Sequence, residues 1–357
     1  MLPIYWVWKP TKRFLRPQLA KVKYHAAIRG YAANSRSIVK RLKETYQPVT
    51  CPLVLVSQVE RSGGSLFAQL FDNHSQLLAH PQELKIGHPE KFVWPPINLN
   101  GGIDENFRIL FEHTAIKMCE EGYLKGNYSV SRKNFFFLPQ AQREIFRSMI
   151  GKVRNPTVRD VLNAYFTSYF NAWINMRADI EAARFVTGFT PRLAADAGNM
   201  DRFWEAYPDG YLISILRSPL HWYPSIVRQK KGKRDFDTRE VIADYWNESV
   251  EAMFREKRRK PERVIIVSFD DLVTKTEATM RLVCRRIGID YEDTLIVPTF
   301  NGKPLEANTS FDPMTPGTVS SAPVTRESAL VAEDRDYIQH KCIPLYDRAM
   351  HELVEAV

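Results

Sequence analysis

Residues 53–66 read LVLVSQVERSGGSL, and this stretch decides the fold of the 357-residue chain. It opens with an apolar run of strand length, Leu53 to Val56. A polar loop with two adjacent glycines follows, and from Leu66 onward apolar residues recur at helical spacing. The pattern therefore predicts a buried strand, a tight loop and a helix in direct succession.

A loop of this kind at the start of a helix is suited to bind an anion. The first-turn N–H groups of a helix are unpaired, and the helix dipole favours negative charge beside them. Gly63 and Gly64 let the backbone approach an anion closely. Ser62 and Ser65 add hydroxyl donors, and Arg61 adds a planar guanidinium that suits phosphate or sulfate oxygens. The alternative is a plain turn in which the serines only cap the helix.

The loop lacks the lysine of an ordinary ATP or GTP site. The Walker A pattern G-x-x-x-x-G-K-[ST] has a lysine before its last residue, whereas Ser65 follows Gly64 directly here. The sequence therefore disfavours an ATP- or GTP-binding loop. Asp270 and Asp271 follow a later apolar strand, as a Walker B acid does, and we expect one of them to cap a helix instead.

The rest of the chain alternates short apolar strands with helices. Strands are predicted at 185–189, 211–216 and 264–267. Helices are predicted at 104–121, 158–174 and 238–259. Further helices are predicted to begin at Pro191 and at about His221, and another to run from Asp270 or Asp271 to Gly288. The last is predicted from about residue 326, with a kink at Pro344. This alternation predicts a P-loop-like, three-layer α/β fold, in which a central parallel sheet has helices on both faces.

A second candidate anion contact lies at the end of strand 211–216. Arg217 follows this strand directly, Pro219 ends it, and Ser225 falls within the next helix. Ligands of open α/β sheets bind beyond the carboxyl ends of the strands. We therefore expect Arg217 and Ser225 to hold one phosphate together. The alternative is that Arg217 pairs with a carboxylate at the edge of the core.

Taken together, these elements resemble the sulfotransferases that use 3′-phosphoadenosine 5′-phosphosulfate (PAPS). Residues 61–66 (RSGGSL) are similar to the R-S-G-[ST]-[ST]-L loop of the carbohydrate and tyrosylprotein branch, and residues 217–225 to its R-[DS]-P…S element. Residues 267–272 (VSFDDL) resemble the strand-to-helix junction of the family, and residues 301–311 resemble its late loop in bacterial members. In order and spacing, the resemblance extends over residues 50–312.

The resemblance implies a metal-independent enzyme that transfers the sulfuryl group of PAPS to a hydroxyl or amine acceptor and releases 3′,5′-adenosine bisphosphate. It further implies three groups of nucleotide-binding residues. The 5′-phosphosulfate is expected on the loop, at Arg61, Ser62, Gly63, Gly64, Ser65 and Leu66. The 3′-phosphate is expected at the strand end, on Arg217 and Ser225. The late loop is expected to cover the nucleotide with Lys303, Asn308 and Ser310.

The chain departs from the family pattern at two positions. Many relatives carry a lysine in a K-[TD]-P motif, where it reaches the sulfuryl group, and Phe189 stands at that position here. Arg192 or Arg61 is a candidate to supply the missing charge. The second departure is Gly64, which removes one hydroxyl donor from the loop.

Glu83 is our candidate for the general base. Sulfuryl transfer needs a group that removes a proton from the acceptor, and a carboxylate with a tuned pKa is suited to this. Glu83 lies where a second strand is expected to end, and the resemblance implies a catalytic glutamate in this region. His80 is a competing candidate, and His74 and His88 are weaker ones. The alternative for Glu83 is a salt-bridged or helix-capping acid.

The acceptor implied by the resemblance is a glycan or glycolipid. Aromatic side chains that stack on sugar rings are candidates to line its site, or else they pack in the core: Trp94, Tyr123, Phe135, Phe136 and Phe137.

The chain carries 50 Lys and Arg against 41 Asp and Glu, a net charge of +9, which indicates anionic partners. We expect residues 1–47 to form a basic helical extension, which either contacts a membrane as a peripheral anchor or packs on the body, and residues 48–357 to form the catalytic domain. The four cysteines are far apart in sequence, which favours a reducing compartment. With no apolar run long enough to span a membrane, a cytoplasmic location is expected.

Two other function classes stay open. An ATP- and Mg²⁺-dependent phosphotransferase predicts metal dependence and a preference for ATP. A non-catalytic protein that binds a membrane or nucleic acid through its basic segment predicts salt-sensitive binding that survives loss of Arg217. No specific nucleic-acid partner is expected under the leading hypothesis.

Overall fold

We describe the protein from a computed structural model, which describes residues 36–84, 93–111, 115–118, 123–125, 128–130, 135–230, 238–305, 315–325 and 330–357. The described residues divide into two compact units. Unit 1 lies within Met1–Thr50, Lys85–Leu124 and Ser129–Met176, and unit 2 within Cys51–Leu84, Lys125–Tyr128 and Arg177–Val357. The strand, loop and helix of residues 53–66 therefore belong to unit 2.

Unit 2 is built on a five-stranded sheet with the strand order β2-β5-β1-β6-β7. All neighbouring strands in it pair in parallel. The strands are β1 (Leu53–Val56), β2 (Leu77–Glu83), β5 (Phe185–Phe189), β6 (Tyr211–Leu216) and β7 (Val264–Ser268). The carboxyl ends of all five strands consequently meet at one edge of the sheet, where the predicted anion-binding residues follow β1 and β6.

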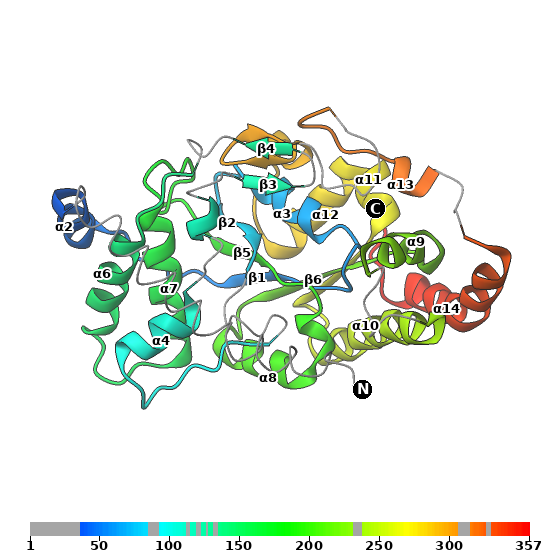
Figure 1. Cartoon of the computed structure of the whole chain (residues 1–357), viewed down its shortest axis with the longest axis horizontal. Helices are drawn as coiled ribbons and strands as arrows, with labels where there is room; N and C mark the ends of the chain where they lie inside the picture. Colours follow the sequence, from blue (N-terminus) through cyan, green and yellow to red (C-terminus); the bar gives the residue numbers. More distant parts are fainter. Residues whose placement is uncertain are drawn as a thin grey trace, which may run out of the picture. The chain divides into compact units, whose positions relative to one another are not determined.

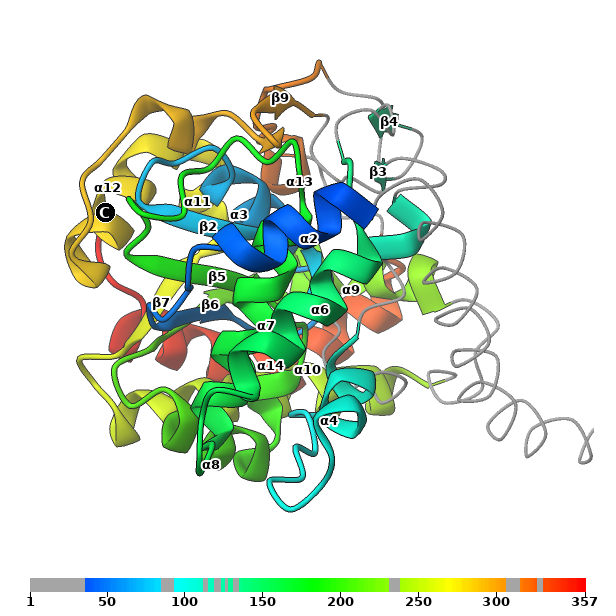
Figure 2. The same ribbon diagram turned by 90° about the vertical axis from the view of Figure 1, so that its left-hand side faces the viewer.

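Helices cover both faces of this sheet (Figures 1 and 2). On one face, α3 (Gly64–Phe71), α11 (Phe269–Thr274) and α12 (Thr276–Ile287) pack with Val54, Ile213 and Ile265 into one apolar cluster. The alternate strand residues, such as Leu55 and Leu212, are equally buried toward the other face. The helices on that face are α8 (Ala197–Ala206), α10 (Arg239–Arg259) and α14 (Ala332–Glu352). The predicted three-layer α/β fold is thus confirmed.

Unit 1 is largely helical. Its helices include α2 (Arg36–Thr45), α4 (Ile103–Leu110), α6 (Pro139–Ile150) and α7 (Val158–Ala172). A capping box fixes the start of α7, since Thr157 accepts from the backbone of Asp160 and the Asp160 carboxylate accepts from the backbone of Thr157. The aromatic stripe of α7 is buried, with Tyr165 and Tyr169 each at most 1% exposed. The prediction that this stripe packs in a core is confirmed.

Several predicted boundaries differ from the observed ones. The predicted helix 104–121 ends at Leu110, and a separate short helical segment covers 115–118. Pro191 does not begin a helix, because Arg192 next to it adopts a left-handed conformation with φ 61°, and α8 starts only at Ala197. The predicted helix 158–174 ends at Ala172. Local backbone geometry, which apolar spacing does not report, accounts for these shifts.

The ends of the helices around β7 were predicted in part. The N-cap of α11 is Ser268, whose hydroxyl accepts from the backbone N–H groups of Asp270 and Asp271. The expectation that Asp270 or Asp271 caps this helix was therefore wrong. Ser268 is the cap, and both aspartates lie in the first turn of the helix. Gly288 ends α12 in the left-handed conformation, as predicted. The last helix, α14, continues past Pro344.

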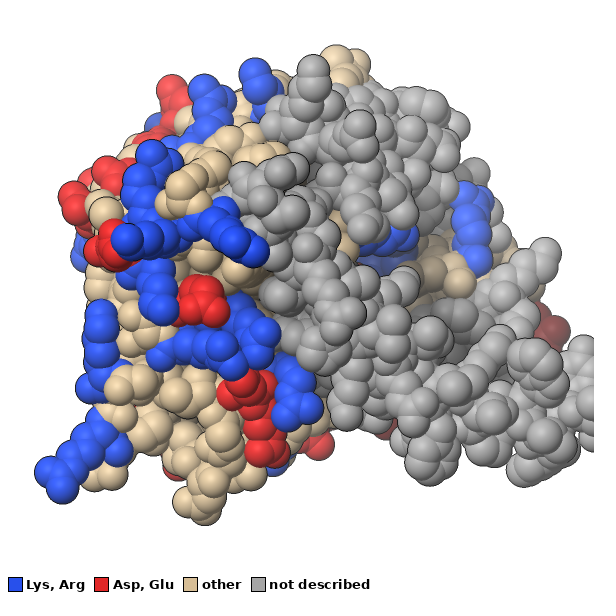
Figure 3. Space-filling model, turned by 60° about the vertical axis from the view of Figure 1, so that its left-hand side comes forward, with Lys and Arg blue, Asp and Glu red and all other residues tan. Residues whose placement is uncertain are grey.

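The basic extension falls mostly outside the described residues. Its described part is α2, which buries Val39 and exposes Lys40, Arg41 and Lys43. On the face drawn in Figure 3, Lys and Arg cover more of the described surface than Asp and Glu do. The proposed boundary between residues 47 and 48, and any membrane contact of this segment, stay predictions. In the described part of the chain, no helix is long and apolar enough to cross a bilayer.

Candidate functional site

The loop between β1 and α3 presents the start of α3 without a capping side chain. The N-cap is Gly63, which takes a left-handed conformation with φ 90° and has no side chain that could accept from the first-turn N–H groups. A Cβ atom on Gly63 would lie 2.9 Å from the ring of Phe269, so glycine is required there for space as well as for conformation. No N-cap side chain therefore occupies the first-turn N–H groups of α3, where an anion is favoured.

Two helices hold the outer side of this loop. Trp222, in α9 (Pro219–Lys230), donates from Nε1 to the carbonyl of Glu60 at 2.7 Å. Tyr245, in α10, donates its hydroxyl to the carboxylate of the same Glu60. Ser249, also in α10, accepts from the backbone N–H of Val59 at 3.0 Å. These contacts fix the loop residues that precede Arg61, and none of them was predicted from the sequence.

Arg217 reaches the loop from the end of β6. Its side chain is 5% exposed, and it donates from Nη1 to the backbone carbonyl of Arg61. The guanidinium carbon lies 4.3 Å from the centre of the Phe269 ring. The atoms Nε and Nη2 are buried and have no hydrogen-bond partner among the described residues. Burial, with a smaller contribution from the charge of Arg61, lowers the pKa of Arg217 to about 10.

A buried guanidinium with unused donors is a strong signal for an anionic ligand. Leaving charged donors unpaired in the interior is unfavourable, and it is offset when an anion supplies acceptors. Asp270 carries an opposite charge in this region, and it raises the pKa of Arg217 slightly. Burial raises the pKa of Asp270, while the charges of His221 and Arg217 lower it, and in the described part of the chain no ion pair joins Asp270 to Arg217. The alternative role of Arg217, pairing with a carboxylate at the core edge, therefore has little support.

Arg61 and Ser225 lie beside Arg217 in the same site. Arg61 donates from Nε to the hydroxyl of Ser225 in α9 at 3.1 Å, and burial lowers the pKa of Arg61. The hydroxyl of Ser62 is fully buried and has no partner among the described residues. The structure thus brings together Arg61, Ser62, Arg217 and Ser225 around the start of α3. Leu66 belongs to the apolar cluster under the sheet, so its side chain serves the core.

The two positions that depart from the family pattern touch each other. A Cβ atom on Gly64 would lie 2.2 Å from Cε2 of Phe189 and 2.3 Å from Nε2 of Gln58. Phe189, 5% exposed at the end of β5, therefore fills the space that a Ser or Thr side chain at position 64 would need. The two departures are therefore in direct contact, which sequence spacing could not reveal.

Glu83 and His80 both lie in β2, which is the strand at one edge of the sheet. Glu83 is the last residue of this strand and pairs in register with Phe189. Its side chain is half-buried, whereas that of His80 is 1% exposed. His74 is also buried, and its Nε2 bonds to the carbonyl of Asp290. Glu83 is thus the more exposed of the two candidates, and its role as the base stays a prediction. His88 lies outside the described residues.

The structure does not bring Lys303 to this site. Lys303 is exposed in a hairpin of β8 (Thr299–Phe300) and β9 (Lys303–Pro304). The carboxylate of Asp72 accepts from Gly302 and Thr299 of this hairpin, at 2.9 and 2.6 Å. Asp72 follows the last residue of α3, so the hairpin lies at the end of α3 opposite to the anion loop. Lys303 therefore stays a prediction, and Asn308 and Ser310 fall outside the described residues.

The aromatic residues proposed for a sugar site are in unit 1. Trp94, Phe135 and Phe137 are at most 2% exposed, so they pack in a core. Phe136 is 52% exposed. The side chain of Tyr123 lies outside the described residues. Only Phe136 of this set is therefore described as open to a ligand.

Among the described residues, no group of three or more His, Cys, Asp or Glu side chains could hold a metal ion.

Comparisons with known proteins agree with this geometry. A family model described as the sulfotransferase family matches residues 52–293, which include the loop, Arg217 and Ser225. The chain belongs to the sulfotransferase family. The matched region begins just before β1 and ends at Asp293, the first residue of η5 (Asp293–Ile296). It therefore includes the whole parallel sheet of this sulfotransferase. No curated protein matches the chain.

Solved structures with a similar fold are bacterial sulfotransferases. The sulfotransferase domain of the Synechococcus olefin synthase is 15% identical, with a TM-score of 0.51, over 87% of this chain and 99% of that domain. A sulfotransferase from Mycobacterium avium is 14% identical, with a TM-score of 0.44, over 93% of this chain and 82% of its own. One from Alicyclobacillus acidocaldarius is 14% identical, with a TM-score of 0.42, over 87% and 98%. The Synechococcus domain supports the three-layer fold of this sulfotransferase.

Proposed function

We propose that this sulfotransferase moves the sulfuryl group of PAPS to a hydroxyl or amine of a glycan or glycolipid. The observation that carries the proposal is Arg217, a buried guanidinium with two unpaired donor atoms beside Arg61 and the start of α3. A nucleotide with phosphates at both ends of its ribose supplies anionic groups for such a site. The family of the chain supports sulfuryl transfer over other chemistries.

The residues divide the donor between two anchoring points. The first is the loop, where Arg61, Ser62, Ser65 and the N–H groups at Gly63 and Gly64 face the 5′-phosphosulfate. The second is the pair Arg217 and Ser225, which holds the 3′-phosphate. Arg61 joins the two, because its side chain contacts Ser225 and its carbonyl accepts from Arg217. Binding one phosphate therefore orders the contacts to the other.

The transfer is an in-line displacement whose rate depends on positioning and charge stabilisation. The acceptor oxygen forms a bond to sulfur while the bond from sulfur to the phosphate oxygen breaks. Glu83 takes the proton of the acceptor, and 3′,5′-adenosine bisphosphate leaves. Arg61 and the loop N–H groups stabilise the negative charge that develops on the departing phosphate.

A transfer assay tests this function. The protein is incubated with PAPS and a panel of glycans and glycolipids, with and without a chelator, and products are read by mass spectrometry. We expect an acceptor to gain a sulfuryl group equally in both conditions. A phosphorylated product that forms only with ATP and Mg²⁺ would instead identify a phosphotransferase. Absence of any product, together with salt-sensitive binding of anionic lipid that survives Arg217→Met, would identify a non-catalytic binder.

A further inference from the structure

Gln58 is a buried polar residue that the proposed function does not use. It lies two residues after β1 and is 3% exposed. Its backbone is held in place, because its carbonyl accepts from the backbone N–H of Arg192 at 2.9 Å. Both polar atoms of its side chain, Nε2 and Oε1, are buried without a hydrogen-bond partner among the described residues. A buried amide in this state is unfavourable and needs a partner that the protein does not supply.

The amide of Gln58 lies against the first turn of α3. The three atoms nearest to the position of a Cβ on Gly64 are Nε2 of Gln58, at 2.3 Å, and two ring carbons of Phe189, at 2.2 and 2.6 Å. An aromatic ring offers no N–H or O–H donor. Gln58 is therefore the polar group on this side of the glycine, next to the first-turn N–H groups. Because residue 64 is glycine and has no Cβ, the amide of Gln58 can lie this close to the backbone of the first turn.

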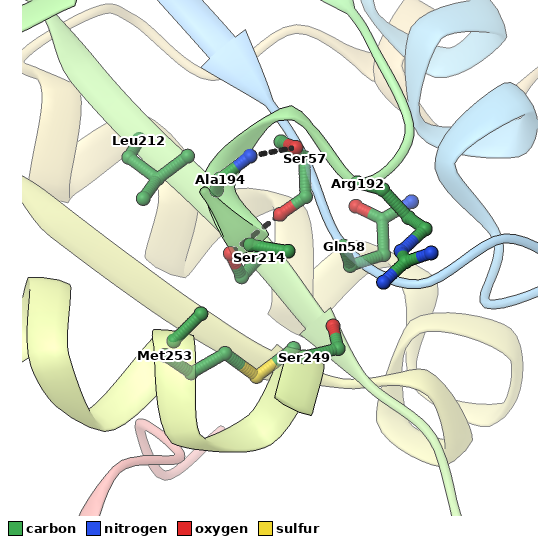
Figure 4. A pocket seen from close by; sticks show the side chains of 10 residues that line it. Ser57, Gln58, Arg192, Ala194, Leu212, Ser214, Ser249 and Met253 are labelled. Carbon is green, nitrogen blue, oxygen red and sulfur yellow. Dashed lines mark hydrogen bonds between the residues drawn. The ribbon is translucent and has the colours of Figure 1, made fainter. Parts of the chain in front are cut away.

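Gln58 also lines a small pocket, in which its amide could instead form a hydrogen bond with a bound water. Figure 4 shows Gln58 and Arg192 together at one side of this pocket, and the hydrogen bonds of Ser57 with Ala194 and Ser214 at another. A water there is a competing partner for the amide, because the mixed lining includes the polar side chains of Ser57, Ser214 and Ser249. With such a water as the partner, loss of the donor in Gln58→Leu would leave the affinity of the loop for anions unchanged, so the two possibilities differ in a measurable way.

We propose that Gln58 is a further ligand-binding residue of the loop, and that its Nε2 donates a hydrogen bond to the anion bound at the start of α3. The identity of that anion as part of PAPS rests on the proposed function. The role of Gln58 as an anion contact does not, because it follows from the position of the amide at the loop. A neutral amide at this point donates without adding charge, beside a ring that excludes water.

Three variants test the proposal: Gln58→Leu, which removes the donor; Gln58→Glu, which places a carboxylate there; and Gln142→Leu as the matched control. Gln142, in α6 of unit 1, is 1% exposed, and its Nε2 and Oε1 also lack partners among the described residues. It therefore matches Gln58 in burial and in its unpaired amide, and differs in having no place at the loop.

Two probes are titrated: inorganic sulfate at constant ionic strength, read as the shift in melting temperature, and 3′,5′-adenosine bisphosphate, read by calorimetry. We expect sulfate affinity to fall about tenfold in Gln58→Leu and further in Gln58→Glu, with Gln142→Leu like wild type. Sulfate also stabilises proteins in general, and this effect is common to all variants. The bisphosphate is expected to follow the same order of affinities.

The results separate the two proposals. Equal sulfate affinity in wild type and Gln58→Leu, whatever the affinity of Gln58→Glu, or no saturable sulfate binding by wild type, overturns the role of Gln58. Saturable sulfate binding that depends on residue 58, without any binding of the bisphosphate, supports the role of Gln58 and contradicts PAPS as the donor. A loss of melting temperature in the ligand-free variants is a structural effect, and it is scored separately from the ligand affinity.

Discussion

The guanidinium of Arg217 donates to the backbone carbonyl of Arg61, so the end of β6 and the anion loop are joined by one hydrogen bond. Arg61 in turn donates to Ser225 of α9. The anion loop and the end of β6 with α9, which are far apart in the sequence, are thus connected by these two hydrogen bonds of Arg61. This arrangement keeps two cationic side chains close together in a buried site, which is unfavourable until an anion binds.

Replacing Arg217 tests whether the ligand-free protein is destabilised by this residue. The pKa of Arg217 is lowered to about 10, so the folded state holds its proton less tightly than the unfolded state. The resulting penalty is fully present below pH 10 and disappears as the pH rises from about 10 toward the higher pKa of the unfolded state. At neutral pH, Arg217→Met is therefore expected to unfold with a free energy equal to or higher than wild type, by at most on the order of 3 kcal/mol.

Chemical denaturation without ligand, at pH 7 and at pH 10.5, measures this difference. A strong destabilisation by Arg217→Met at pH 7 would mean that Arg217 serves the fold, and that its hydrogen bond to Arg61 and its contact with Phe269 outweigh its burial.

Glu83→Gln tests the proposed base. The amide keeps the shape of the side chain but accepts no proton, so we expect kcat to fall by a factor of about 100 or more. Binding of 3′,5′-adenosine bisphosphate is expected to be unchanged, because Glu83 acts on the acceptor. Glu277→Gln is the control, since Glu277 is exposed and pairs with Arg281, which has no part in the proposed site. If instead His80→Gln abolishes turnover and Glu83→Gln does not, the histidine is the base.

Gly64 and Phe189 are expected to be energetically coupled. Gly64→Ala introduces a Cβ that would lie 2.2 Å from the Phe189 ring, so we expect loss of both stability and anion affinity. Phe189→Leu removes part of the ring and should offset the effect of Gly64→Ala in the double variant, with a coupling of about 1–3 kcal/mol. Gly102→Ala is the control, because nothing lies within 4 Å of its Cβ position. Additive effects in the cycle would show that the two residues do not compete for the same space.

Tyr245→Phe tests how the loop is held. The change removes the hydroxyl that donates to Glu60 and leaves the ring on which Arg192 stacks at 3.5 Å. We expect the KM for the donor to rise several-fold, with a smaller change in kcat, since one hydrogen bond to a charged group contributes about 1.5–3 kcal/mol. Steady-state kinetics at varied donor concentration measure both constants.

The matched control is Tyr291→Phe. Arg281 stacks on Tyr291 at 3.7 Å in the same way, but the Tyr291 hydroxyl has no hydrogen-bond partner among the described residues. An equal rise of KM in both variants would mean that Tyr245 contributes only through packing.

The sequence predicted the fold because the strands of a buried parallel sheet are continuous apolar runs, and β1, β6 and β7 all have this form. It also singled out Arg61 and Ser62 in the loop, and Arg217 and Ser225 at the second strand end, as two anion contacts, and the structure places these side chains in one site. It did not predict that Gly64 and Phe189 touch, or that Trp222 and Tyr245 hold Glu60, because these contacts join residues from separate elements. Lys303 was assigned to the nucleotide by a motif match alone; its hairpin is bonded to Asp72, which follows the last residue of α3, and its role stays a prediction.

The central claim is that the loop and Arg217 bind a nucleotide with phosphates on both ribose positions. The most direct measurement is a calorimetric titration of the full chain with 3′,5′-adenosine bisphosphate, without metal, beside ATP with Mg²⁺ and AMP, for wild type and Arg217→Ala. We expect tight binding of the bisphosphate, much weaker binding of AMP, and a loss of bisphosphate affinity of about a hundredfold in Arg217→Ala. Absence of bisphosphate binding, or a clear preference for ATP with Mg²⁺, would contradict the account.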